Sequence, residues 1–330
     1  MDIFLQQLVN GLTQGAVYAL VALGYTMVYG IIGLINFAHG EVVMVGAMVA
    51  LSVIAALVGA NLGLAPMVVV LLGTLAAIPV CMAVGYGLDR LAYRPLRNAP
   101  RLAPLITAIG MSIILQQLAM VIWSRNNLAF PQIIPPYVLE FAGAAITGVQ
   151  LAIIGMSFVL MVALSVLVYR TRLGIAMRAT AENPHVAQLM GVATDRVIAV
   201  TFIVGGGLAA VAGVMYGTYY GIAHYTMGAM LGLKAFSAAV LGGIGNIAGA
   251  MVGGIVLGLV EAFGAGYISN FTDLCDWPGL SSLFAARCAA DGHLVMFGSN
   301  YQDVFAFLVL ILVLVLRPSG LLGERTADRA

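Results

Sequence analysis

Nine apolar blocks follow one another along the chain, with only short polar stretches between them. Crossing the hydrocarbon core of a bilayer takes about 20 apolar residues in a helix, and most of the blocks reach that length. The chain is 62% hydrophobic and 8% charged, whereas soluble domains have roughly 45–50% apolar and about 25% charged residues. The sequence therefore predicts an all-α fold, a polytopic transmembrane helical bundle of eight to nine spans, in a single transmembrane domain over residues 1–330. The blocks cover roughly residues 7–34, 42–60, 65–87, 103–123, 147–169, 197–221, 227–245, 247–268 and 303–316.

The arginines are concentrated in two loops and in the C-terminal tail. An arginine at the centre of a membrane helix costs roughly 2.5–3.5 kcal/mol on insertion scales, so these groups are expected outside the bilayer. If all nine blocks span, the loops and the tail face one side, which the positive-inside rule assigns to the cytoplasm, and the N-terminus is outside. The block 227–245, rich in glycine and interrupted by Lys234, could instead be two half-helices or a re-entrant piece. The loop arginines are Arg90, Arg94, Arg97 and Arg101, then Arg170, Arg172, Arg178 and Arg196.

Charge and motifs exclude several functions. A net charge of +1 leaves no basic field for nucleic acid. The sequence has no GxxxxGK[ST] loop, so we do not expect the chain to bind ATP or any other cofactor itself. The four histidines are scattered and lack cysteine or carboxylate neighbours at zinc spacing, so no metal site is predicted.

Many of the 40 glycines lie inside apolar blocks at four-residue spacing. Small faces of this kind let helix backbones approach closely. Two interpretations are open: tight packing within the chain, or smooth seams that slide when a transporter alternates its openings. The two clearest rows are Gly213, Gly217 and Gly221, and Gly245, Gly249 and Gly253.

Polar residues interrupt the apolar pattern between the first two blocks. Asn36, His39 and Glu41 stand there with no arginine beside them. They could form a turn in which Asn36 caps a helix end and Glu41 sits near the next helix N-terminus. Alternatively, they mark a broken helix near a translocation path, where freed backbone groups line a cavity.

Two opposite charges lie in the late apolar blocks. Lys234 is the only lysine, and Glu261 is the only carboxylate deep in a late block. Because unpaired charges at such depth are costly, we expect each to have a partner. If the two blocks form an antiparallel pair, Lys234 and Glu261 come within reach of one another, either as a structural contact or as part of a substrate path.

The loop 170–196 has the pattern of a short amphipathic helix. Asn183 can cap it, Pro184 suits its first turn, and Val186, Leu189 and Met190 form an apolar stripe at three- and four-residue spacing. Such a helix could receive a push from another protein, or it could rest on the membrane surface.

A second loop, 269–302, is acidic and contains two cysteines. If this loop faces an oxidising compartment, Cys275 and Cys288 could form a disulfide; two free thiols or a partner contact are the alternatives. Its aspartates could attract a basic partner or simply be solvated. Cys81, within an apolar block, is expected to be a buried small hydrophobe. The aspartates are Asp273, Asp276 and Asp291.

Four stretches resemble branched-chain amino-acid ABC transporter permeases of the LivH type. They are the opening NGLTQGAVYALVALGYTMVYGIIGLINFAHGEVVMVGAMVA, the block RATAENPHVAQLMGVATDRVIAVTF, the run GLKAFSAAVLGGIGNIAGAMVGGIVLGLVE and the ending RPSGLLG. The resemblance implies a multi-pass importer subunit in a bacterial inner membrane, surrounded by lipid. It also implies a homologous second permease as heterodimer partner, two cytoplasmic ATPase subunits that supply ATP hydrolysis, and a periplasmic substrate-binding protein.

The resemblance also implies a role for the loop 170–196. Importer permeases carry a cytoplasmic coupling helix with the pattern Glu-Ala-Ala, three residues, then Gly. Ala187 and Gly191 match the last Ala and the Gly, while His185 and Val186 replace the Glu and the first Ala. We therefore expect the contact with an ATPase to involve Glu182, Asn183, His185, Ala187 and Gly191. The loop 269–302 is longer than the family pattern predicts.

The expected function is translocation of leucine, isoleucine and valine, with Asn36, His39, Glu41, Lys234 and Glu261 along the path. Permeases for urea, short amides or other amino acids look much the same. An ion-coupled secondary transporter normally has carboxylates in several spans, and a channel needs a filter motif. With only Glu41 and Glu261 inside its apolar part, the sequence does not favour an ion-coupled transporter, and it has no visible filter motif that would indicate a channel.

Overall fold

The computed structural model describes residues 2–61, 63–97, 99–100, 102–134, 137–141, 143–271 and 301–323. Most of these residues are helical. Helices are the expected outcome because a helix satisfies its own backbone hydrogen bonds in a medium without water. The helices are α1 (Asp2–Ile32), α2 (His39–Gly59), α3 (Pro66–Leu88), α4 (Leu102–Trp123), α5 (Gly148–Arg170), α6 (Arg172–Glu182), α7 (Pro184–Leu189), α8 (Thr194–Tyr220), α9 (Met227–Gly242), α10 (Ile247–Phe271) and α13 (Gln302–Leu316).

Short irregular helices and strands complete the fold. The end of α3 continues through a π-helical turn, η1 (Asp89–Tyr93), and a 3-10 turn, η2 (Arg94–Leu96). Strand β1 (Leu128–Ala129) pairs antiparallel with β4 (Ile222–Ala223), and β2 (Val138–Phe141) pairs antiparallel with β3 (Ala144–Thr147). The predicted all-α class of fold still holds, because the described residues are mostly helical and the strands are short. The two pairs lie in connections between helices, where strands of two to four residues leave no alternating pattern long enough to read.

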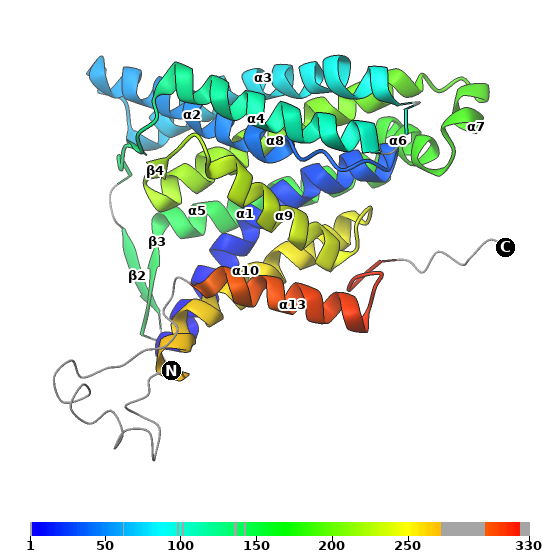
Figure 1. Cartoon of the computed structure of the whole chain (residues 1–330). Helices are drawn as coiled ribbons and strands as arrows, with labels where there is room; N and C mark the ends of the chain where they lie inside the picture. Colours follow the sequence, from blue (N-terminus) through cyan, green and yellow to red (C-terminus); the bar gives the residue numbers. More distant parts are fainter. Residues whose placement is uncertain are drawn as a thin grey trace.

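Apart from α6 and α7, the helices run back and forth between two ends of a bundle (Figure 1). At one end, here called the arginine end, lie η1, η2, α6, α7 and residues 317–323; the β2–β3 hairpin and the start of α1 lie at the other, the strand end. Of the nine arginines in the described residues, eight are at the arginine end, and only Arg125, just after α4, is at the strand end. The prediction that the two arginine-rich loops share one face is confirmed.

Seven helices in the described residues are long and apolar enough to cross a membrane: α1 to α5, α8 and α10. Helices α9 and α13 have 16 and 15 residues, or about 24 and 22 Å at 1.5 Å per residue, against about 30 Å for the hydrocarbon core. The predicted count of eight to nine spans is thus not reached by length alone. Since α9 is one uninterrupted helix with Lys234 inside it, the interpretation of 227–245 as two half-helices is wrong.

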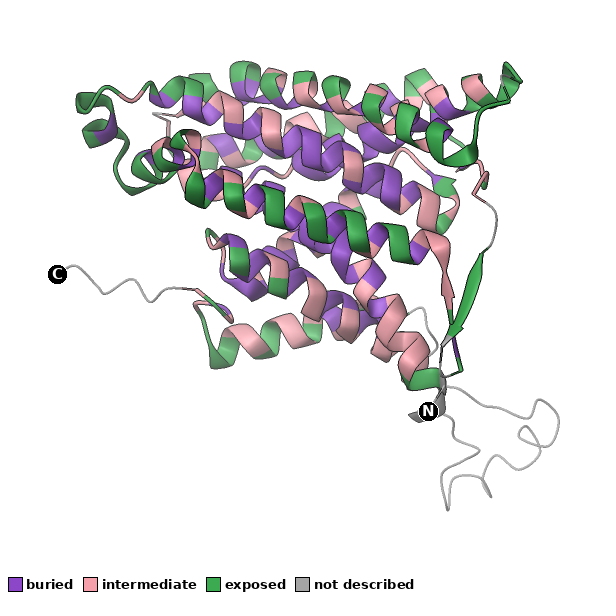
Figure 2. Cartoon of the chain, turned by 180° about the vertical axis from the view of Figure 1, so that it is seen from behind, coloured by how far each residue is buried: buried purple, intermediate pink, exposed green. Residues whose placement is uncertain are grey.

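Most residues of α1 and α8 are buried, whereas only a minority of the residues in α3, α4 and α5 are, as the colouring of Figure 2 shows. The inner helices meet through glycines. A Cβ added to Gly258 of α10 would collide with the backbone of Gly15 on α1, and one added to Gly40 of α2 would meet the backbone of Gly228 and Gly232 on α9. These contacts let helix axes approach more closely than larger side chains permit.

The two glycine rows found in the sequence serve mixed purposes. Gly213 packs against the backbone of Val43, Gly217 faces the ring of Phe130, and Gly221 ends α8 with a φ of +69°. Gly249 and Gly253 pack against the end of α9, whereas Gly245 has no atom close to its Cβ position. The contacts favour tight packing, the first of the two interpretations.

The substitution Gly258→Leu tests this packing. Its side chain has no space beside Gly15, so we expect a loss of about 1–3 kcal/mol of stability or more and a lower melting temperature in detergent. The matched control is Gly110→Leu in α4, where no atom of the described residues lies within 4 Å of the added Cβ. Equal melting temperatures for the two variants would contradict the role assigned to Gly258.

Candidate functional site

The loop at the arginine end contains two helices, α6 and α7, rather than the single short helix predicted. Asn183 lies between them with extended backbone, and its side-chain oxygen accepts hydrogen bonds from the backbone N–H of His185 (3.0 Å) and Val186 (3.1 Å). Pro184 occupies the first turn of α7. The predicted cap and helix start are confirmed, although α7 has only six residues.

The apolar side of α7 faces away from the body of the chain. Leu189 and Met190 are 86% and 80% exposed, and Val186 is half-exposed, whereas Ala187 is buried against the loop. Glu182 and His185 are also exposed. An apolar stripe at the tip of a protruding loop (Figure 1) is a surface that a partner or a membrane can cover.

The end of α7 has the hydrogen-bond pattern of a Schellman motif. The N–H of Gly191 donates to the carbonyl of Gln188 (2.9 Å), and the N–H of Val192 donates to the carbonyl of Ala187 (2.9 Å). Gly191 has a φ of +86°, a region that strains L-residues with a Cβ. The Gln188 side chain donates to the hydroxyl of Thr194 (2.7 Å) and ties α7 to the start of α8. The loop therefore has a fixed shape of its own.

Ion pairs connect this loop to the end of α3. Asp195, in the first turn of α8, binds Arg94 (2.7 Å) and Arg97 (2.6 Å), and Arg97 also binds the buried Asp89 (2.6 Å). Sequence reasoning missed this network because its partners are 98 and 101 residues apart. Any displacement of the loop is thereby linked to both α3 and α8.

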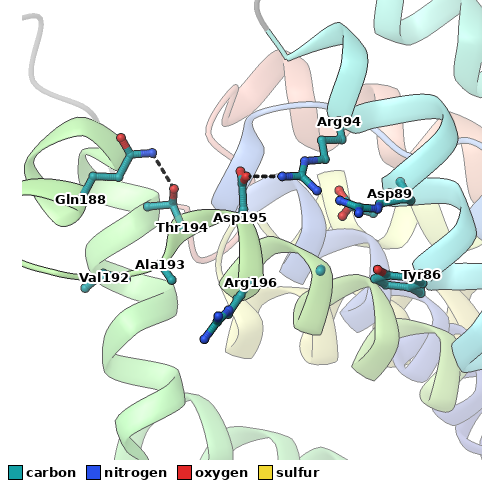
Figure 3. A pocket seen from close by; sticks show the side chains of 11 residues that line it. Tyr86, Asp89, Arg94, Gln188, Val192, Ala193, Thr194, Asp195 and Arg196 are labelled. Atoms are coloured by element: carbon teal, nitrogen blue, oxygen red, sulfur yellow. Dashed lines mark hydrogen bonds and ion pairs between the residues drawn. The ribbon is translucent and has the colours of Figure 1, made fainter.

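A polar cavity of about 500 Å³ lies between the end of α3 and the start of α8 (Figure 3). Figure 3 marks the hydrogen bond from Gln188 to Thr194 and the ion pair between Arg94 and Asp195, both between residues that line the cavity. The loop is thus attached to the bundle through a few polar contacts around a hollow. The lining residues are Tyr86, Asp89, Arg90, Arg94, Gln188, Val192, Ala193, Thr194, Asp195, Arg196 and Ala199.

The segment that joins α1 to α2 is buried. Asn36 caps neither helix: its side-chain oxygen accepts a hydrogen bond from the Tyr93 hydroxyl of η1 (2.9 Å), and the N-cap of α2 is Ala38. The capping interpretation was wrong because a distant tyrosine competes for this amide. Glu41 does lie in the first turn of α2, as predicted.

Glu41 and His39 contact other helices. The Glu41 carboxylate is fully buried, and its Oε1 accepts hydrogen bonds from Gln116 (2.7 Å) and Ser112 (3.1 Å) of α4. The imidazole of His39 packs over Gly24 of α1 and lies edge-on to Tyr25, with 5.1 Å between ring centroids. Glu41 Oε2 and His39 Nε2 are buried and have no hydrogen-bond partner among the residues that the structure describes. The structure thus brings three of the predicted path residues into one buried junction.

The second buried cluster lies between α9, α10 and α13. The predicted contact between Lys234 and Glu261 is confirmed, with 2.6 Å between Nζ and Oε1. Lys234 Nζ also binds Asp303 of α13 (2.7 Å) and lies 3.5 Å from the Tyr18 hydroxyl of α1. Sequence reasoning missed Asp303 because it stands at the edge of the last apolar block.

Other predicted features are only partly covered. Cys275, Cys288 and the aspartates Asp273, Asp276 and Asp291 lie outside the described residues. Cys81 is buried, as predicted, with its thiol 3.4 Å from the carbonyl oxygen of Val42. In the part of the chain that the structure describes, no three His, Cys, Asp or Glu side chains are grouped to hold a metal ion.

The helical bundle with its apolar surface defines a multi-pass membrane protein. Residues 7–314 match the family described as the branched-chain amino acid transport system / permease component. The chain belongs to this permease family, and its expected resemblance is confirmed.

Similar proteins cover almost the whole chain. The high-affinity branched-chain amino acid transport system permease protein BraD of Pseudomonas aeruginosa is 44% identical over 99% of this chain and 98% of its own length. LivH of Escherichia coli strain K12, with the same description, is 43% identical over 99% and 97%. A probable branched-chain amino acid transport permease protein LivH of Methanocaldococcus jannaschii is 29% identical over 92% and 88%. No solved structure matches the chain.

The substitution Asp195→Asn tests the attachment of the loop. Two partly exposed ion pairs are lost, worth about 1 kcal/mol together, so amide hydrogen exchange in residues 184–192 should accelerate up to about fivefold without loss of the fold. The control is Glu182→Gln, because Glu182 is exposed and has no ion pair within the described residues. Unchanged exchange in the Asp195 variant would rule out the tether.

Proposed function

We propose that this chain is the membrane-spanning permease subunit of an ABC importer that moves leucine, isoleucine and valine across the bacterial inner membrane. The observation that carries the proposal is the exposed apolar stripe of α7 at the arginine end of a chain that belongs to the branched-chain permease family. BraD and LivH, which resemble it over almost their whole length, are high-affinity permeases for these amino acids.

In the proposed orientation, the arginine end is cytoplasmic and the strand end is periplasmic. The positive-inside rule supports this because eight of nine described arginines are at one end. We further propose nine spans, with α9 and α13 as the two short ones. A bilayer adjusts to short helices by local thinning at modest cost, and both helices run between the same two ends as their neighbours.

Two ATPase subunits bind and hydrolyse the ATP in this proposal, and their movement is transmitted to the permease through the loop 170–196. The residues expected at this contact lie in or next to α7, and Asn183 caps its start. They are Glu182, Asn183, His185, Ala187 and Gly191. A displacement of α7 at Leu189 and Met190 would be transmitted to α8 through the hydrogen bond from Gln188 to Thr194. It would be transmitted to the end of α3 through the ion pairs of Asp195 with Arg94 and Arg97. These contacts support transmission of movement from a partner into the bundle.

The translocation path is proposed to run past the two buried polar clusters, with Asn36, His39 and Glu41 in one and Lys234 and Glu261 in the other. Polar groups at membrane depth are costly and commonly mark substrate pathways. The single domain 1–330 forms half of the pore in this proposal, and a homologous second permease forms the other half. A periplasmic binding protein delivers the substrate to this pore.

The disulfide between Cys275 and Cys288 in the loop 269–302 stays a prediction.

Reconstitution tests the substrate and the energy source. Proteoliposomes with both permeases, the ATPases and the binding protein should take up leucine, isoleucine and valine only when ATP is hydrolysed. Uptake of urea, acetamide or another class of amino acid instead would replace the substrate assignment. Uptake by this chain alone under a proton or sodium gradient would replace the importer with an ion-coupled carrier.

The coupling surface is tested by the double substitution Leu189→Asp and Met190→Asp. Loss of two exposed apolar contacts should lower ATP-driven uptake about tenfold or more while the permease remains folded and the ATPases keep basal hydrolysis. The matched control is Leu139→Asp, an exposed apolar residue of β2 at the strand end. Full uptake by the double variant would overturn the coupling role.

Gly191→Arg should also uncouple ATP hydrolysis from uptake. Because Gly191 has a positive φ, the arginine would add backbone strain as well as a bulky charged side chain. The companion variant Gly191→Asn separates the two effects, since asparagine tolerates the left-handed region. Coupling should survive in the asparagine variant and fail in the arginine variant. Equal uptake by both would show that residue 191 does not contact the ATPase.

A further inference from the structure

The cluster around Lys234 contains one cation and two carboxylates. Lys234 comes from α9, Glu261 from α10 and Asp303 from the first turn of α13, with ion-pair distances of 2.6 and 2.7 Å to the ammonium. With all three groups ionised, the cluster carries one excess negative charge. A buried ion pair is stabilising only when its groups are well paired. How far each of the three side chains is exposed shows which of them a ligand can reach.

The two carboxylates are unequally accessible. The Glu261 side chain is completely buried, and within the described part of the chain its Oε2 has no hydrogen-bond partner. The Asp303 side chain is 31% exposed and the Lys234 side chain 12% exposed. Glu261 therefore holds the lysine from inside, with the Tyr18 ring centroid 5.8 Å from Nζ. Asp303 Oδ1, which binds the lysine, is itself buried. The rest of the Asp303 side chain, together with Lys234, forms the more accessible edge of the cluster.

We propose that this accessible pair is an exchange site for a zwitterionic α-amino acid. The α-carboxylate of the substrate forms an ion pair with the Lys234 ammonium, and the α-ammonium forms one with the Asp303 carboxylate. One ion pair is replaced by two, and the net charge of the cluster is unchanged because the substrate is neutral overall. This inference rests on the proposed function and adds to it the group that each end of the substrate binds.

The balance of charges explains why such a site suits this cargo. A free amino acid has two full charges that must lose water in the membrane, and each is costly without a partner. Fixed opposite charges compensate for that loss at both ends of the molecule. Because Glu261 remains on Lys234 throughout, the lysine never becomes an uncompensated charge. A neutral amide or a lone metal cation gains only one of the two contacts.

An apolar surface for the side chain lies one turn away on the same helix. Met230 is four residues before Lys234, which places it on the same face of α9, and its side chain is 51% exposed. Methionine adapts its shape to branched aliphatic groups. A branched substrate held at Lys234 and Asp303 would therefore cover Met230.

Protection of a cysteine at position 230 tests the site. In the importer assembled from both permeases and the ATPases but without the binding protein, Cys81, Cys275 and Cys288 of this chain are replaced by serine, and Met230→Cys is labelled with a small thiol reagent. For a dissociation constant of about 1 mM, about 10 mM leucine should slow labelling about tenfold. Ile113→Cys, on the exposed side of α4 with similar exposure, should be labelled at one rate with or without leucine.

Ligand and protein variants separate binding from a structural role. The leucine analogues 4-methylpentanoate, which lacks the ammonium, and 3-methylbutylamine, which lacks the carboxylate, should give no protection. Asp303→Asn should abolish protection by leucine, and Asp303→Glu should retain it. Size-exclusion profiles check that each variant is assembled. If Asp303→Asn fails to assemble, the test is whether the two analogues protect Met230→Cys when Lys234, Glu261 and Asp303 are unchanged.

The proposal is overturned if leucine does not slow labelling of Met230→Cys, or if an analogue protects as well as leucine. It is also overturned if an assembled Asp303→Asn variant is still protected. ATP-driven leucine uptake by the unmutated importer is measured separately. Uptake without protection rejects this site alone, whereas absence of uptake rejects the proposed function.

Discussion

Close contact between helix backbones is the interaction on which the rest of this structure depends. In a bilayer, apolar side chains gain little by leaving lipid for protein, so helices associate through van der Waals contact at small residues. Gly15 with Gly258 joins α1 to α10, Gly40 with Gly228 joins α2 to α9, and Gly242 with Gly249 closes the turn between α9 and α10. These contacts define which polar groups can reach one another inside the bundle.

The same contacts bring distant sequence motifs together. The segment 36–41 lies against α9 near Gly228, and the turn after α9 lies against the chain end. There the N–H groups of Leu321 and Leu322 donate to the carbonyls of Leu241 and Gly242 (both 2.9 Å). Three of the stretches that carry the family resemblance are therefore neighbours in space, which gives their shared sequence a packing reason in addition to any functional one.

Buried charge attaches the peripheral helices. Few residues of helix α4 are buried, yet Ser112 and Gln116 bind the buried carboxylate of Glu41. Helix α13 is similarly attached through Asp303 and Lys234. Breaking such a contact leaves an unpaired charge in a low-dielectric interior, which costs several kcal/mol. At the arginine end the ion pairs of Asp195 are partly exposed and weaker, so the loop that bears α7 is attached but can still be displaced.

The sequence by itself determined the class of fold, the positions of most long helices, the shared face of the arginine loops and the cap at Asn183, because hydrophobic length, charge cost and capping chemistry are local. It also predicted the contact between Lys234 and Glu261, since two lone opposite charges in adjacent blocks have few other partners. Only the tertiary structure decided that Asn36 binds Tyr93 rather than a helix end, that Glu41 is held by α4, and that Asp303 and Asp195 complete their clusters. Those partners are 57 to 101 residues apart in the sequence. Whether they meet depends on how the glycine faces pack, which no local sequence pattern shows.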